Sequence, residues 1–394
     1  MSICLEPAVL KEPIRASVHH AQRTIRVALL CDMTEENWYS MDLVGEMLFS
    51  HLPRGSRTLE IEPTVVRPGL PKALRRSPLL CRRLTGRFLQ YPHQLQRLRK
   101  QFDVFHLIDH SYAHLVHHLP PDRTVVTCHD LDTFRSILHR EQENRSFAFR
   151  LMTRRILAGL KKAAHVTCDT AATRDAILKH NILPEHRLSI VHNGVHPALG
   201  PLPDRVADAY LSRLLQRAPG DCVELLHVGS IVRRKRIDVL LRVFAAVLKT
   251  TPRVRLVRVG GPLTAVQEKL ANELGIRKRI DILPHLESNQ LAAAYRRASL
   301  VLQPSEAEGF GLPVIESLAC GTPVLASDIP ALREIGGDAV RYCPIDDIQS
   351  WCRAVLALLT APPSRDQLLA HARAFTWGAY ATEMAHLYEK VLPR

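Results

Sequence analysis

The sequence lacks several features that would assign it to common classes of protein. No stretch approaches the run of about 18 to 20 apolar residues that a membrane-spanning helix needs. Residues 1–24 have no continuous apolar segment of the secretory type, so we expect a cytoplasmic protein. The nine cysteines are scattered without a C-x-x-C pair, which argues against a metal site or a disulfide framework. Reduced thiols are the expectation in that compartment.

Acidic residues are missing from one basic part of the chain. The formal net charge is +14, and residues 67–100 contain no Asp or Glu among their many Arg and Lys. Such a surplus predicts attraction to anions without naming the anion. The segment offers few aromatics for stacking on bases, Phe88 and Tyr91, and no recognisable nucleic-acid module. We therefore expect no nucleic-acid partner, although a basic nucleic-acid-binding protein is one alternative.

What the sequence does contain is an alternation of apolar strands and amphipathic helices. This pattern predicts parallel sheets covered by helices. In the first half, strands are expected at residues 25–31, 103–108, 124–128, 165–168 and 188–191, with a helix at 147–162. In the second half, strands are expected at 223–228, 255–259, 280–283 and 299–303, with a helix at 236–249.

A stretch rich in Pro and Gly divides the chain into two similar halves. We predict an α/β protein made of two Rossmann-like domains that face each other across a crevice. Its predicted parts are an extension (1–24), an N-terminal domain (25–200) completed by a C-terminal helix (379–394), a linker (201–221) and a C-terminal domain (222–378). Ligands of such sheets bind at the carboxyl ends of the strands.

The strongest functional motif is PSEAEGFGLPVIESLACGTPV at residues 304–324. Gly309 and Gly311 allow close approach of the backbone, and Pro313 suits the start of a helix. A helix start presents free N–H groups to an anion. Glu308 and Glu316 flank that start and could accept hydrogen bonds from hydroxyl groups, an arrangement that suits a sugar nucleotide. The alternative is a solvated Glu308 and a Glu316 that only favours the helix start.

A second motif, LHVGSIVRRKRID, covers residues 226–238. A strand ends at Gly229, and Arg233, Arg234 and Lys235 lie at the mouth of the next helix. Cations in that place could neutralise the charge on a departing diphosphate. The alternative is a solvated basic face. His129 follows an apolar strand, where a sheet delivers residues to a crevice, but a single histidine is more often structural.

Together these motifs resemble a known family. In order they are V-G-S-x-x-x-R-K, R-V-G-G-P and P-S-x-x-E-G-F-G-L-P-x-x-E-S-x-A-C-G-T-P-V. They are similar to those of the retaining glycosyltransferases of the GT-B fold that carry an E-x7-E pair (glycosyl transferases group 1, family 4). TVVTCHDLD, HVTCDTAATRDAIL and IVHNGVHP resemble segments of the same family, so the similarity extends from about residue 25 to residue 392.

The resemblance implies a role for each matching residue. Glu316 corresponds to the carboxylate that holds the ribose hydroxyls, and Glu308 to the one near the hydroxyls of the donor sugar. Arg234 and Lys235 correspond to the diphosphate clamp, and His129 to the N-domain histidine at the donor sugar. The donor loops that the resemblance implies are Gly229 and Ser230 in one and Gly309, Phe310, Gly311 and Leu312 in the other.

The resemblance also implies an activity, which is transfer of a hexose from a nucleotide sugar with retention of configuration. It implies no catalytic metal, no separate cofactor, a UDP- or GDP-sugar donor, and a glycan or lipid-linked acceptor. A sugar-nucleotide epimerase is an alternative. One departure concerns the loop after the first strand, where many members have Gly-Gly. Here CDMTEENWYSMDL contains no glycine before Gly45, which leaves the contacts of the N-terminal domain open.

The basic segment at residues 67–100 suggests a hypothesis about location. Its leucines and arginines could form a surface that lies on an anionic membrane without spanning it. Peripheral attachment to the inner face of the membrane and an amphiphilic acceptor would follow. The alternatives are a surface that only attracts nucleotide sugars and leucines that belong to the core.

Overall fold

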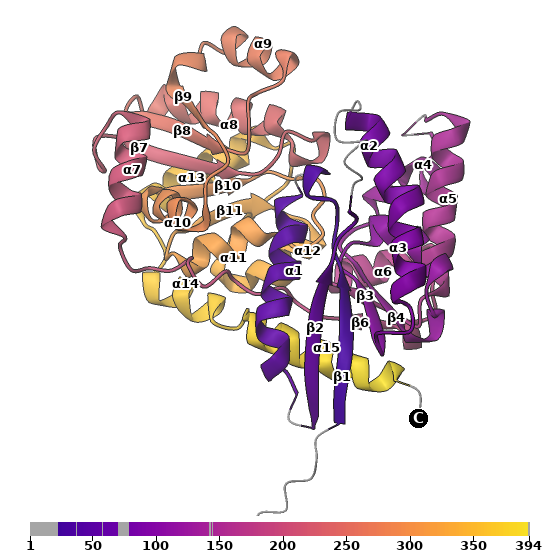
Figure 1. Cartoon of the computed structure of the whole chain (residues 1–394). Coiled ribbons are helices and arrows are strands. Elements are labelled where there is room, and N and C mark those ends of the chain that lie inside the picture. Colours follow the sequence, from indigo (N-terminus) through magenta and orange to yellow (C-terminus); the bar gives the residue numbers. More distant parts are fainter. Residues whose placement is uncertain are drawn as a thin grey trace, which may run out of the picture.

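A computed structural model describes residues 23–36, 38–56, 58–69, 79–141, 143 and 145–392. Two lobes stand beside each other, each built on a parallel sheet (Figure 1). The predicted extension at 1–24 lies almost wholly outside the described residues, as do Lys72, Arg75 and Arg76 of the basic segment. The prediction of two Rossmann-like domains in a GT-B arrangement is confirmed.

The N-terminal sheet has the strand order β2-β1-β3-β4-β5-β6, with all neighbours parallel. Its strands are β1 Arg23–Leu30, β2 Leu59–Val66, β3 Val104–Leu107, β4 Thr124–Cys128, β5 His165–Cys168 and β6 Leu188–Ile190. Its helices are α1 Tyr39–His51, α2 Leu79–Thr85, α3 Tyr91–Leu98, α4 Arg135–Leu138, α5 Phe147–Lys162 and α6 Ala171–Lys179, with 3-10 turns at Thr34–Glu36 and His110–His118. Apolar side chains of the strands fill both faces, as expected of a sheet covered on two sides.

The C-terminal sheet has the order β12-β11-β10-β7-β8-β9 and is also parallel. Its strands are β7 Val223–Val228, β8 Val254–Val259, β9 Ile280–Leu283, β10 Leu300–Gln303, β11 Val324–Ser327 and β12 Arg341–Cys343. The helices that follow residue 200 are α7 Arg205–Leu215, α8 Ile237–Thr250, α9 Ala265–Glu273, α10 Ser288–Arg297, α11 Leu312–Ala319, α12 Pro330–Gly336, α13 Ile348–Thr360, α14 Arg365–Ala372 and α15 Trp377–Val391. The last of these, α15, runs back beneath the N-terminal sheet and packs on α1 (Figure 1).

The prediction of a linker over residues 201–221 is wrong for residues 205–215, which form α7. Asp204 caps this helix by accepting hydrogen bonds from two backbone N–H groups. Ala207, Leu211 and Leu215 recur at helical spacing and are buried against α10, so α7 belongs to the C-terminal domain. The flanking prolines and glycines obscured this short periodicity.

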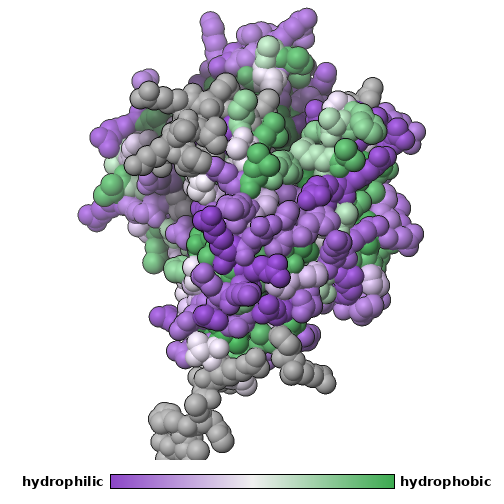
Figure 2. All heavy atoms as spheres, turned by 45° about the vertical axis from the view of Figure 1, so that its right-hand side comes forward, coloured by the Kyte–Doolittle hydropathy of each residue, from purple (hydrophilic) through white to green (hydrophobic). Residues whose placement is uncertain are grey.

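The two domains touch along the crevice between them. The ring of Tyr39, on α1, stacks on His285 of the C-terminal domain with 3.7 Å between ring centroids. Glu334, on α12, accepts a hydrogen bond of 2.8 Å from the backbone N–H of Ala171 at the start of α6. Among the described helices, none is long and apolar enough to span a bilayer. On the side of the molecule in Figure 2, hydrophilic side chains predominate and hydrophobic ones gather in the upper part.

Candidate active site

The glycine-rich loop joins β10 to α11 and faces the N-terminal domain. A Cβ added to Gly309 would lie 2.1 Å from the backbone oxygen of His129, so only glycine lets the two backbones meet there. Gly311 caps α11 with a φ of 105°, a conformation that other residues rarely adopt. The structure therefore explains why both positions are glycine, and it places the loop before α11 in contact with the N-terminal domain.

Glu308 lies at the centre of a buried polar cluster. Its carboxylate accepts hydrogen bonds from Lys235 Nζ at 2.6 and 2.8 Å and from Arg234 Nη1 at 3.1 Å. Gln303 Nε2 and Ser305 Oγ donate to the same carboxylate at 2.6 and 2.7 Å. Burial alone would raise the pKa of Glu308, but the two cations bring it down to about 2. The carboxylate is thus ionised, and it neutralises part of the predicted diphosphate clamp.

Arg234 also reaches across to the N-terminal domain. Its Nε lies 2.7 Å from Asp132 Oδ2, and its Nη2 lies 3.5 Å from Asp130 Oδ2. Its Nη1 donates to the backbone oxygen of Ala307 as well. One guanidinium therefore binds three carboxylates from both domains, and we call the contact with Asp130 and Asp132 the Arg234 latch. The sequence placed Arg234 at the donor site but gave no sign of this latch.

The loops after β7 and β8 lie next to Lys235. A Cβ at Gly260 would lie 2.1 Å from the backbone oxygen of Gly229, so these loops also touch backbone to backbone. Behind them, the fully buried Arg258 donates to the oxygens of Gly229, at 3.0 Å, and of Gly261. Both described partners of Arg258 are backbone oxygens, its Nε has no hydrogen-bond partner among the described residues, and burial lowers its pKa to about 10. Arg258 is the first residue of the R-V-G-G-P motif, to which sequence analysis gave no role.

Glu316 lies on α11 and is buried away from the cations that surround Glu308. Its Oε2 accepts a hydrogen bond of 2.7 Å from the hydroxyl of Tyr295. Burial raises the pKa of Glu316 to about 7, although the Tyr295 hydroxyl and the charge of Lys235 act in the opposite direction. The two members of the E-x7-E pair therefore differ in ionisation. Glu308 is fully ionised at neutral pH, whereas the pKa of Glu316 lies close to pH 7.

His129 is at the crevice, but its ring is held from within the N-terminal domain. Nδ1 lies 2.6 Å from Asp169 Oδ2, and Nε2 lies 2.8 Å from the backbone oxygen of Ile108. Burial would lower the pKa of His129, but the neighbouring carboxylate of Asp169 raises it to about 10. Both ring nitrogens of His129 donate hydrogen bonds within the N-terminal domain. The part of His129 that contacts the glycine-rich loop is its backbone. Contact of its ring with a donor sugar stays a prediction.

The loop after β1 supplies buried polar atoms that sequence analysis did not select. Both carboxylate oxygens of Asp32 are buried and have no hydrogen-bond partner among the described residues. The same holds for Glu36 Oε2, His110 Nε2 and Ser136 Oγ. Burial raises the pKa of Asp32 well above its usual range, and the charge of Asp109 acts in the same direction. Buried polar groups are normally paired, so these atoms are unusual among the described residues.

Several arginines of the basic segment pair with acidic residues that follow β1 in the chain. One salt bridge reaches α1, between Arg67 and Asp42 at 2.6 Å. Two reach the turn at Thr34–Glu36, and these are Arg82–Glu35 at 3.0 Å and Arg87–Glu36 at 3.6 Å. Arg87 also stacks over the ring of Tyr112 at 4.0 Å. These cations therefore organise the loop that replaces the glycine pair expected of the family.

A cavity of about 650 Å³ adjoins the Arg234 latch. Its lining comes from both domains and includes Asp130, Asp132, Arg135, Arg233, Arg234, Glu306 and Glu308. Charged groups of both signs thus face a space between the sheets. In the part of the chain that the structure describes, no group of three or more His, Cys, Asp or Glu side chains could hold a metal ion.

Comparison with known proteins places both halves among glycosyltransferases. Residues 216–375 match the family model described as "Glycosyl transferases group 1", and residues 47–199 match "Glycosyltransferase Family 4". A curated relative named D-inositol 3-phosphate glycosyltransferase, from Thermobispora bispora, is 34% identical over 54% of this chain and 52% of its own. The chain thus spans about half the length of the curated relatives it matches.

Solved structures extend the similarity of fold to nearly the whole chain. Sucrose-phosphate synthase from Thermosynechococcus elongatus superposes with a TM-score of 0.71 at 22% identity, covering 93% of this chain and 99% of that one. Alr3699/HepE from Anabaena, solved in complex with UDP, gives a TM-score of 0.66 at 15% identity over 93% of this chain and 100% of that one. At these identities the likeness concerns the fold.

Proposed function

We propose that this chain, which belongs to the glycosyl transferases group 1 through residues 216–375 and carries a glycosyltransferase family 4 domain at 47–199, transfers a sugar from a nucleoside diphosphate donor to an acceptor hydroxyl. The observation that carries the proposal is the convergence of Glu308, Arg234 and Lys235 at the opening of α11, between two Rossmann-like sheets. Helix starts of this kind bind anions, and the cations beside this one suit a diphosphate.

In the proposed donor complex, Glu316 accepts hydrogen bonds from the ribose hydroxyls and the diphosphate lies against Lys235 and Arg234. The diphosphate then replaces Asp130 and Asp132 as partners of Arg234, so that donor binding opens the latch. The solved Anabaena structure in complex with UDP supports a nucleoside diphosphate as the ligand of this fold. We propose a UDP- or GDP-sugar as the donor.

The proposed reaction proceeds with retention of configuration. The bond between the anomeric carbon and the phosphate oxygen breaks as the acceptor oxygen bonds to the same face of that carbon. The acceptor proton passes to an oxygen of the leaving phosphate. Lys235, Arg234 and the buried Arg258 stabilise the negative charge that develops on the diphosphate, so the proposed step requires no metal ion.

The acceptor that the crevice suits best is rich in hydroxyl groups. The unpaired oxygens of Asp32 and Glu36 and the nitrogen of His110 could each bond such a group. The curated relatives named D-inositol 3-phosphate glycosyltransferases support a polyol acceptor. A glycan or a lipid-linked precursor presents the same chemistry.

We further propose that the N-terminal domain binds an anionic membrane surface. The basic segment gives this proposal little support, because Arg82 and Arg87 form salt bridges with Glu35 and Glu36. The helix that supports it is α5. Phe147 and Leu151 on that helix are 68% and 55% exposed, and the helix carries five cations and no acid. Such a helix suits the interface of an anionic bilayer, where each basic residue contributes about 1 kcal/mol.

Liposome flotation tests the membrane proposal. Binding is expected with anionic vesicles and should fade at high salt and in the double variant Phe147→Ser with Leu151→Ser. The matched control is Leu202→Ser with Val206→Ser, since both residues are 79% exposed and lie outside the N-terminal domain. Equal binding to neutral vesicles, or an equal loss in the control, would overturn the proposal.

A thermal-shift panel of nucleotides and nucleotide sugars tests the proposed donor. A ligand at ~100 times its dissociation constant should add roughly 2.7 kcal/mol of stability. Release of nucleoside diphosphate from the selected donor, in EDTA and with a glycan or polyol acceptor, then tests transfer. Loss of activity in EDTA that a divalent ion restores would contradict a metal-independent step. Conversion of the donor to an epimer without release would favour the epimerase alternative.

A further inference from the structure

A second cavity lies away from the donor site, where the chain crosses twice between the domains. The first crossing leaves the N-terminal domain at residues 194–201, and the second returns at residues 373–378. The backbone N–H of Val195 donates to the oxygen of Phe375 at 3.1 Å. A Cβ at Gly194 would lie 2.3 Å from the backbone nitrogen of Trp377, so the two crossings touch there without spare room.

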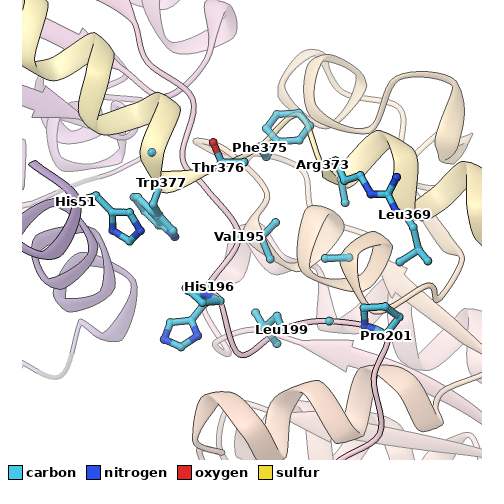
Figure 3. Close-up of a pocket in the computed structure, with 15 residues that line it drawn as sticks. His51, Val195, His196, Leu199, Pro201, Leu369, Arg373, Phe375, Thr376 and Trp377 are labelled. Atoms are coloured by element: carbon cyan, nitrogen blue, oxygen red, sulfur yellow. The ribbon is translucent and has the colours of Figure 1, made fainter. Parts of the chain in front are cut away.

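Beside this contact the crossings diverge and leave a cavity of about 380 Å³ (Figure 3). Its apolar wall is formed by Val195, Leu199, Leu369, Phe375 and the ring of Trp377. His51, at the end of α1, brings the N-terminal domain to the same space, and α14 brings the C-terminal domain. The cavity is thus bounded by both domains and by both crossings.

The charged side chain that lines this cavity is a cation, Arg373. No Asp or Glu is among its fifteen described lining residues. Of the two imidazoles that line it, His51 donates through Nδ1 to the backbone oxygen of Met47 at 2.9 Å, so the remaining nitrogen of a neutral ring is an acceptor. The backbone N–H of Ala198 donates to Nδ1 of His196, which leaves the proton of a neutral ring on Nε2. The lining therefore suits an anion and disfavours a cation.

Trp377 adds a donor that has no partner. Its side chain is 2% exposed, and its Nε1 has no hydrogen-bond acceptor among the described residues. Figure 3 shows the indole beside His51, with its nitrogen on the side of Val195 and His196. A buried N–H left unpaired costs about 1 to 3 kcal/mol, so a ligand that accepts from it is favoured.

We propose that this cavity binds a small organic anion with an apolar body, such as an aromatic or branched carboxylate, sulfonate or phosphate ester. Its apolar body packs on Leu369 and Phe375, and its acid group accepts from Trp377 and Arg373. Because the ligand touches both crossings, it changes the ease with which the domains close and hence the affinity for the donor. Only this last coupling rests on the proposed function.

The binding itself is tested with 8-anilinonaphthalene-1-sulfonate as the probe. Gly200 and Gly378 line the cavity, and a Cβ at either meets no atom within 4 Å, so Gly200→Phe and Gly378→Phe fill it without a clash of the new Cβ. The matched control is Gly69→Phe, since a Cβ at Gly69 also meets open space and this residue lies outside the cavity. Circular dichroism confirms that each variant folds.

The wild type and Gly69→Phe should bind one probe molecule in a saturable manner, and both filled variants should lose affinity by about tenfold or more. The uncharged analogue N-phenyl-1-naphthylamine should bind the wild type more weakly than the sulfonate. Equal probe affinity in the filled variants and the control, or equal affinity for the charged and uncharged probes, would overturn the proposed site.

Calorimetry with UDP tests the coupling. Saturating probe should change the dissociation constant of UDP about threefold or more in the wild type, and UDP should change that of the probe by the same factor. The filled variants should show no such coupling. Probe binding without coupling would overturn the effect on closure. Failure of UDP to bind at all would count against the proposed function and leave the fluorescence result to decide the site.

Discussion

The ionisation of Glu316 makes donor binding depend on pH in a way that can be worked out. Burial raises the pKa of this carboxyl from 4.5 to about 7, while ribose hydroxyls donate to its ionised form. Donor binding should therefore release a proton below the pKa of about 7. At one pH unit below that pKa, about one carboxyl in ten is ionised, so the affinity should be about tenfold below its plateau at alkaline pH.

The nucleotide sugar selected by the thermal-shift panel is the appropriate ligand, because its two esterified phosphates do not titrate near neutral pH. Isothermal titration from pH 5.5 to 8.5 should give a dissociation constant that falls as pH rises towards ~8 and then levels off. Glu316→Gln keeps the shape of the side chain but removes the titration. At pH 8 it should also bind more weakly, since hydrogen bonds to a charged group contribute about 1.5 to 3 kcal/mol.

The same pKa has the opposite consequence for the stability of the free protein. A carboxyl whose folded pKa of about 7 exceeds its unfolded value of 4.5 stabilises the fold at low pH, and that contribution is lost as pH rises between the two values. The loss amounts to roughly 3 kcal/mol across this range. Glu316→Gln should thus melt at a higher temperature than the wild type at pH 8 and respond less to pH. Parallel pH profiles for the wild type and Glu316→Gln would refute the reasoning.

Three further changes test other parts of the site. Lys235→Ala should lower kcat by ~10²-fold or more, measured as release of nucleoside diphosphate. The reason is that the ammonium group of Lys235, held 2.6 Å from Glu308, supplies positive charge to the leaving diphosphate. Near-normal turnover would count against the clamp. Arg258→Met should weaken pyrophosphate binding about tenfold in calorimetry while nucleoside binding is unchanged, since it removes a buried cation whose described partners are backbone oxygens. Asp132→Asn should strengthen donor binding several-fold by weakening the 2.7 Å latch on Arg234, whereas the exposed control Asp175→Asn should not, and equal affinities would contradict the latch.

Elements with strong local patterns could be predicted from the sequence. The strands at 165–168 and 223–228 and the helix at 147–162 have the predicted bounds, because continuous apolar runs and a capping Ser146 fix them locally. The edge strand β2 was missed, since its charged residues alternate with apolar ones and Pro63 interrupts it. An edge strand tolerates both features, and the single sequence gives no sign of its neighbour.

The site could be predicted only as far as neighbouring residues define it. The glycine-rich loop, the E-x7-E pair and the basic pair at 234–235 are local motifs, and the structure brings Glu308, Arg234 and Lys235 together. The partners of His129 and the Arg234 latch come from strands and loops far apart in the chain. Such contacts depend on how the strands and the two domains are arranged in space, and this arrangement cannot be derived from local sequence motifs.

The most direct test of the proposed activity is real-time proton NMR of the selected nucleotide sugar with the enzyme and an acceptor. The account predicts that the anomeric signal of the donor decays as one new glycoside signal appears with the same anomeric configuration, and that Lys235→Ala slows both changes together. A product of inverted configuration would contradict retention. A donor signal that persists while the nucleotide binds would contradict glycosyl transfer itself.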